Sequence, residues 1–139
     1  MFVTALFVFA GCSGKPQPMI NTLPFTSASQ VKKIRWFSVT KEVVITKQIQ
    51  IQDVVSILTN RTVATTPNSK KLVWHSGLEF YVGSTNAICT VNLYSNDRVT
   101  IGDTYYIVRP DLVKSIEARV AEFQRQNEQT ENAEPKHPR

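Results

Sequence analysis

The chain has 139 residues, of which 42% are hydrophobic and 19% are charged. These fractions are close to the averages of folded domains and exclude a largely disordered chain, while the length excludes two domains of ordinary size. The formal charge of +5 favours anionic partners, but the basic residues are spread along the chain, as on an ordinary soluble surface.

The N-terminus carries the strongest pattern in the sequence. Residues 2–10 (FVTALFVFA) are apolar except for Thr4. A membrane-spanning helix needs about 20 apolar residues, whereas the hydrophobic region of a secretory signal peptide needs only about 7–15. The small residues Ala10 and Gly11 follow, and Cys12 comes next. The pattern therefore predicts a cleaved export signal and not a membrane span.

The segment Phe9-Ala10-Gly11-Cys12 resembles the lipobox of bacterial lipoproteins, a resemblance that covers only the leader. Phe9 stands where the family prefers an aliphatic residue. No Lys or Arg precedes the apolar run, although a signal peptide usually begins with basic residues. We expect that translation starts upstream of Met1 and that this explains the difference. The resemblance implies that residues 1–11 are a signal peptide, that the thiol of Cys12 receives a diacylglycerol, and that the new amino terminus is acylated. Two or three acyl chains hold a protein firmly to a bilayer. The resemblance therefore implies a lipid-anchored protein on the extracytoplasmic side of the cell envelope.

The two ends of the remaining chain have compositions that predict little structure. Residues 12–30 are rich in Ser, Thr and Pro, and prolines disfavour helix, so we expect a flexible tether. Residues 126–139 contain one Ala and no larger aliphatic or aromatic side chain, and we expect a disordered polar tail. The folded domain is therefore predicted over residues 31–125.

The first half of this domain is predicted to form strand and then helix. Residues 33–40 have a β-rich composition, and residues 42–45 extend that strand or form a second one. Thr46 is a suitable cap for a helix over residues 47–60. Four apolar residues recur there with the spacing of one helix face: Ile51, Val54, Val55 and Leu58. The alternation of Gln and Ile at the start of this segment also suits a strand.

The second half is predicted to form closely spaced strands and a final helix. The strand candidates are residues 72–75, 78–82, 88–94, 98–101 and 104–108. Connections this short permit only antiparallel pairing. Pro110 suits the first position of a helix over about residues 110–125, whose apolar face consists of Leu112, Val113, Ile116, Val120 and Phe123. The sequence thus predicts a single two-layer α+β domain, with an antiparallel sheet of about four to six strands against two helices.

Candidate catalytic groups are few. His75 is the only histidine in the predicted domain, and a nucleophile pair with Ser76 would also need an orienting group and an oxyanion site. Asp97 and Asp103 flank a short strand and could act as an acid–base or calcium-binding pair, although both occupy turn positions that Asp favours. Cys89 is interpreted as a small buried hydrophobe. We expect no metal, no cofactor and no catalytic set.

Two further groups of residues suggest binding. Four tyrosines in predicted strands could form an aromatic surface or pack in the core: Tyr81, Tyr94, Tyr105 and Tyr106. The segment 32–37 (KKIRWF) mixes cations with aromatic side chains, as nucleic-acid binders do. Because of the export signal we expect no nucleic-acid partner. The basic residues could instead contact anionic lipid headgroups, and Trp36 is interpreted as a core residue.

Three hypotheses on function follow. The first is a membrane-anchored, non-enzymatic envelope module that binds a protein or cell-wall partner, with an exposed sheet edge as one means of binding. The second is a small extracytoplasmic hydrolase or ligand carrier that uses His75 with Asp97 or Asp103, and it predicts a cavity shared by at least two of these residues. The third is a cytosolic, basic nucleic-acid binder.

Overall fold

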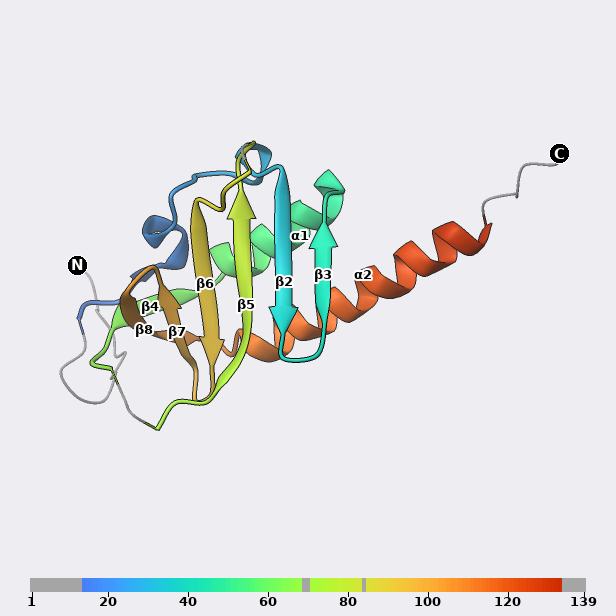
Figure 1. The fold of residues 1–139 in the computed structure, drawn as a ribbon. Helices are drawn as coiled ribbons and strands as arrows, with labels where there is room; N and C mark the ends of the chain where they lie inside the picture. The colour runs from blue at the N-terminus through green and yellow to red at the C-terminus, as the bar shows by residue number, and fades with distance from the viewer. Residues whose placement is uncertain (1–13, 69–70, 84, 134–139) are drawn as a thin grey trace, which may run out of the picture.

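A computed structural model describes residues 14–68, 71–83 and 85–133. It confirms the α+β class, with one open antiparallel sheet packed against two helices (Figure 1). Over the described residues the sheet has eight strands in the order β1-β4-β8-β7-β6-β5-β2-β3. Cys12 and the rest of the predicted leader lie outside the described residues.

The elements follow one another along the chain with short connections. The strands are β1 (Gln17–Pro18), β2 (Lys33–Ser38), β3 (Glu42–Ile45), β4 (Thr62–Thr65), β5 (Trp74–Tyr81), β6 (Cys89–Tyr94), β7 (Arg98–Ile101) and β8 (Thr104–Arg109). The helices are α1 (Gln48–Thr59) and α2 (Val113–Ala133), with two short 3₁₀ turns, η1 (Met19–Thr22) and η2 (Ala28–Gln30). Each neighbouring pair of strands is antiparallel, as predicted.

Side chains alternate between the two faces of the sheet and so assign each residue to one layer. On one face, apolar side chains from β2, β5 and β6 are fully buried beneath the helices, among them Ile34, Leu78, Phe80, Val91 and Leu93. Both helices cover this face, behind the sheet in the view of Figure 1. Among the described residues, no helix lies on the opposite face (Figure 1), and we call it the open face.

The helices bury the stripes that their spacing predicted. In α1 the buried apolar residues are Ile51, Val54, Val55 and Leu58, so helix and not strand is confirmed. Lys47, rather than Thr46, occupies the N-cap position and gives no side-chain cap. Along α2, Ile116, Val120 and Phe123 are buried in the same core. Among the described residues, no helix has the length and apolar character needed to span a membrane.

The predicted tether is wrong from residue 14 onward, because this segment folds against the domain. Met19, Leu23 and Phe25 are buried, and the Phe25 ring lies 5.1 Å from that of Phe80. β1 pairs with β4, and the Gly14 amide donates to the Thr65 carbonyl at 3.0 Å. The segment is irregular and interrupted by prolines, so its three large apolar side chains show no periodicity that would reveal them.

The predicted bounds of the last helix are wrong at both ends. α2 begins at Val113, three residues after Pro110, and its first backbone hydrogen bond runs from the Ile116 amide to the Leu112 carbonyl at 3.0 Å. The helix continues to Ala133, through part of the segment predicted to be disordered. Side chains of that segment bond to α1: the buried Gln50 donates to Gln126 at 3.2 Å and to Asn127 at 3.3 Å.

Two strand predictions need correction. The candidates over residues 72–75 and 78–82 are one strand, β5, with an irregularity in register between Trp74 and Ser76. An extra residue at such a bulge changes the phase of the side chains, and this divided one strand into two in the sequence. β4 was not predicted, because it is only four residues long (Thr62–Thr65) and leads into a loop of turn-forming residues.

Candidate binding surface on the open face of the sheet

The open face is lined by the alternate residues of the strands whose other side chains form the core. On β2, Lys33, Arg35 and Phe37 lie on this face, whereas Ile34 and Trp36 are buried on the other. Trp36 is therefore a core residue, as interpreted from the sequence. The open face has two parts, a polar network near the middle of β2 and a strip of aromatic side chains toward the end of β2.

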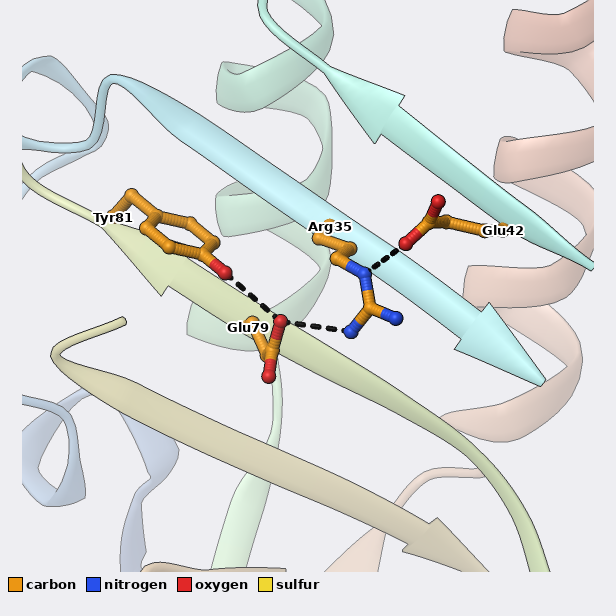
Figure 2. Close-up of polar contacts among 4 residues, drawn as sticks. All are labelled: Arg35, Glu42, Glu79 and Tyr81. Atoms are coloured by element: carbon orange, nitrogen blue, oxygen red, sulfur yellow. Dashed lines mark hydrogen bonds and ion pairs between the residues drawn. The ribbon is translucent and has the colours of Figure 1, made fainter. Parts of the chain in front are cut away.

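The polar network joins three strands (Figure 2). Arg35 contacts Glu42 of β3 and donates to Glu79 of β5 at 2.8 Å. The Tyr81 hydroxyl donates to the same carboxylate oxygen of Glu79 at 3.0 Å. One guanidinium is thus shared by two carboxylates, which leaves the cluster with a net formal charge of −1.

These contacts favour the charged form of Arg35 and the neutral form of Tyr81. Hydrogen bonds to Glu42 and then Glu79 raise the pKa of Arg35 above its usual value. The hydrogen bond to Glu79 raises the pKa of Tyr81, so its phenol remains a neutral donor. The Lys33 ammonium lies 4.2 Å from the centroid of the Tyr81 ring, a cation–π distance. Two cations of the segment 32–37, Lys33 and Arg35, therefore have partners on this face, and Arg35 lies between two carboxylates instead of facing solvent as a free phosphate ligand.

The aromatic strip begins at Phe37. Its ring lies directly over Gly77 of the neighbouring strand, so closely that a Cβ atom on Gly77 would come within 2.4 Å of the ring. The same ring also contacts Arg35, whose guanidinium carbon lies 4.4 Å from the Phe37 ring centroid. Trp74 follows, with its ring centroid 5.8 Å from that of Phe37. Gly77 thus permits a large ring to lie flat on the sheet, which no side chain at that position would allow.

The strip continues across the next strands. The Trp74 indole N–H donates to Asn92 at 2.9 Å, and the Tyr94 and Tyr105 rings lie 6.4 Å apart. We call Phe37, Trp74, Tyr94 and Tyr105 the aromatic strip; all four are partly exposed. Three of the four tyrosines singled out in the sequence lie on the open face, while Tyr106 packs against the core. Phe37 belongs to the segment 32–37 singled out in the sequence, but Trp74 was missed, and the bulge in β5 is the reason that Trp74 lies on this face.

A cavity of about 380 Å³ lies at one end of the aromatic strip. It is formed by the start of β5, the β6–β7 turn and the start of α2, and its lining is Val73, Trp74, His75, Tyr94, Ser95, Asn96, Asp97, Asp111, Val113 and Lys114. His75 and Asp97 therefore share a cavity, as the second hypothesis requires. Asp103 does not line it.

His75 takes part in a chain of polar contacts that resembles a catalytic relay in composition only. Its Nε2 lies 2.8 Å from a carboxylate oxygen of Glu117, and its Nδ1 lies 2.9 Å from the Ser76 hydroxyl. A nucleophile must reach its substrate, but Ser76 is only 1% exposed and faces the core. Both ring nitrogens of His75 are occupied, so the arrangement ties β5 to α2.

Asp97 has the turn role that its sequence position favoured. Asn96 and Asp97 have φ angles of 60° and 58°, a left-handed conformation that Asn and Asp tolerate. The Asp97 carbonyl accepts from the Val108 amide at 2.8 Å, and its carboxylate lies 3.8 Å from Arg109.

The remaining candidate groups are not brought together. Cys89 is a free thiol, partly buried against the core, and burial raises its pKa to about 11. Among the described residues, no group of three His, Cys, Asp or Glu side chains could hold a metal ion.

Two further hollows lie on the helix side of the domain. A groove of about 460 Å³ lies between α1 and α2, and a cavity of about 300 Å³ is lined by residues that include His75, Glu117 and Trp36.

The comparisons with known proteins identify no relative: the chain matches no protein-family model, no curated protein and no solved structure.

Proposed function

We propose that this chain is a lipid-anchored, extracytoplasmic lipoprotein that acts as a non-enzymatic binding module of the cell envelope. The lipobox-like segment ending at Cys12 supports the address. The aromatic strip on the open face supports the binding role, and it is the observation on which that role depends.

Aromatic side chains supply large contact areas at interfaces for a small loss of conformational freedom. In the aromatic strip these side chains lie partly exposed on a sheet face that no helix covers. Phe37 is fixed over Gly77 and Trp74 is fixed by Asn92, so the surface is ordered before a partner binds. Such preorganisation favours affinity, because little freedom remains to be lost on association.

The alternatives have less support. A hydrolase based on His75 lacks an accessible hydroxyl nucleophile, since Ser76 is buried. The other form of this hypothesis, a ligand carrier, is supported by one observation, the cavity that His75 and Asp97 share. A ligand carrier is compatible with the binding role. A nucleic-acid binder would need free cations, but Arg35 is held by two glutamates.

The address is tested by intact-mass analysis of the protein purified from its native membrane. We expect a mature chain that begins at Cys12 and carries the mass of its acyl groups. A Cys12→Ala variant should be retained in unprocessed form without lipid. A native protein with residues 1–11 intact and an unmodified thiol would overturn the proposal.

The binding role is tested by site-specific photo-crosslinking in intact cells. A photoreactive side chain at Tyr105, in the aromatic strip, should form discrete adducts. The same side chain at Ser56, an exposed position of α1, is the matched control and should form few. Equal adducts from both positions, or none from Tyr105, would contradict a partner on the open face.

A further inference from the structure

We infer that the cavity at the end of the aromatic strip binds a neutral oligosaccharide. The inference deepens the proposed binding role by naming a ligand class, and it depends on that role. It follows from four properties of the cavity: its size and rigidity, the aromatic residues on its wall, its hydrogen-bonding groups, and the distribution of its charges.

The cavity has the size and construction of a ligand site. Its volume of about 380 Å³ falls in the range of about 300–1,000 Å³ typical of small-molecule pockets. The β6–β7 turn is bound to the start of β5 by two hydrogen bonds, from the Ser95 amide to the Val73 carbonyl at 2.9 Å and from the Val73 amide to the Ser95 hydroxyl at 3.2 Å. The same turn is bound to β8 through the Asp97 carbonyl. Segments distant in sequence are thus fixed around one space.

Trp74 and Tyr94 supply the aromatic wall of the cavity. The indole N–H of Trp74 is already donated to Asn92, so its remaining contribution is the apolar ring. Tyr94 is supported from behind by its contact with Tyr105. Pyranose rings have flat faces of C–H groups that pack on aromatic rings, while their hydroxyls project from the edges and seek polar partners.

The polar groups of the cavity suit hydroxyls. Oxygen acceptors are supplied by Asp97, Asp111 and Asn96, and N–H donors are supplied by Lys114. Sugar hydroxyls donate and accept at the same carbon, so they can use both kinds of group. Mixed acceptors and donors beside ring faces are therefore complementary to a polyol.

The charges disfavour a strongly charged ligand. Two carboxylates line the cavity, but Lys114 lines it as well, and Arg109 lies 3.8 Å from Asp97. Cations and carboxylates are thus interspersed around the cavity, since Arg61 also donates to the Asp111 carbonyl and Arg98 to the Asn96 carbonyl. An organic cation would prefer carboxylates without such partners, although the aromatic wall alone would also suit it. A strongly anionic ligand would have to place its charge beside Asp97 or Asp111.

The inference is tested by NMR titration of the full chain in detergent. The probes are tetrasaccharides of N-acetylglucosamine and of glucose, with a tetrasaccharide of galacturonic acid and choline as charged comparisons. The two tryptophans make the readout specific, because Trp74 lines the cavity and Trp36 is buried beneath the helices. We expect a neutral tetrasaccharide to shift the Trp74 indole signal saturably while that of Trp36 stays in place.

Variants locate the site. Trp74→Ala should weaken binding by about tenfold or more, since aromatic anchors dominate such contacts. Asp111→Asn, at an exposed position, should weaken it less and tests the cavity without disturbing the aromatic strip. Tyr81→Ala is the matched control, because Tyr81 lies on the open face but not in the cavity; its affinity should be unchanged.

Three results would count against the proposals and can be told apart. The ligand class is wrong if no neutral sugar shifts the Trp74 signal at concentrations up to about 10 mM, or if choline binds more tightly than every sugar. In either case, a partner found by crosslinking would still support the binding role. If a tetrasaccharide binds and is cleaved, the ligand class stands and the non-enzymatic assignment falls.

Discussion

The two faces of one sheet show two different ways in which side chains are kept in place. On the helix-covered face, residues such as Phe80 and Leu93 are fixed by complete burial. On the open face, the rings and charges are only partly buried and are fixed by one another: Phe37 by Gly77, and Arg35 by two carboxylates. The first face contains the main hydrophobic core, while the open face buries the smaller pair Ala64 and Ile107. The second is ordered without being essential to the core, which leaves it available for binding.

The largest expected effect separates the two faces by stability. Phe80→Ala removes a fully buried ring that contacts Phe25, and such changes lower the free energy of unfolding by about 3–5 kcal/mol. The matched change on the open face, Phe37→Ala, should cost less than half as much because that ring is partly exposed. Urea denaturation of both variants measures the difference. Equal losses would contradict the division of roles.

A second test uses the thiol on the helix-covered side. Because burial raises the pKa of Cys89 to about 11, less thiolate is present at pH 8 than for a free cysteine, and alkylation should be about 100-fold slower. The pH profile of alkylation in native protein should have its midpoint near 11. Folding stability should be constant below the unfolded pKa of the thiol and should fall as the pH rises through its folded pKa. Rapid alkylation at pH 8 would show that the thiol is not buried.

A third test concerns the ring over Gly77. Gly77→Ala places a Cβ atom against Phe37 and should destabilise the fold by about 1 kcal/mol or more, as overpacking does. In a Phe37→Ala background the same change should be neutral or stabilising, because glycine is unfavourable inside a strand. A double-mutant cycle measures this coupling. Additive effects would mean that the ring does not rest on Gly77.

The smallest expected effect is in the polar network. Glu79→Gln removes the carboxylate that raises the pKa of Tyr81, so the Tyr81 titration, followed by ultraviolet absorbance, should move down toward its usual value. Because the pKa of Tyr81 is higher in the folded state than in the unfolded state, its contacts stabilise the protein at pH values below the unfolded pKa. This stabilisation is lost as the pH rises through the folded pKa. The variant should therefore lose less stability than the wild type between neutral and strongly alkaline pH. Glu42→Gln is the control and should move the Tyr81 titration less.

The helix-covered face was largely predictable from sequence. The spacing of Ile51, Val54, Val55 and Leu58 identified α1, and alternation identified most of β5 and β6, because burial on one face imposes a period on the sequence. The turns on either side identified β7 and β8. The open face was less so. Its tyrosines on β5, β6 and β8 were recognised as surface candidates, but Trp74 was not, since the bulge that turns it outward leaves no compositional sign.

The N-terminal segment shows another limit. Met19 and Phe25 are core residues, yet they lie among prolines and short turns where no repeating pattern exists. Gln126 and Asn127 likewise belong to a folded helix because of partners on α1, which local composition does not reveal. Contacts between residues distant in sequence decide both segments.

The hydrogen bond from the Gly14 amide to the Thr65 carbonyl has a geometric consequence for the anchored protein. Cys12 precedes Gly14 by two residues, and two extended residues span at most about 7 Å. With lipid on Cys12, the β1–β4 edge of the sheet would stand almost on the headgroups, and β3, at the opposite edge, would point away from the bilayer. The proposed anchor would thus hold the β1–β4 edge of the module close to the membrane surface.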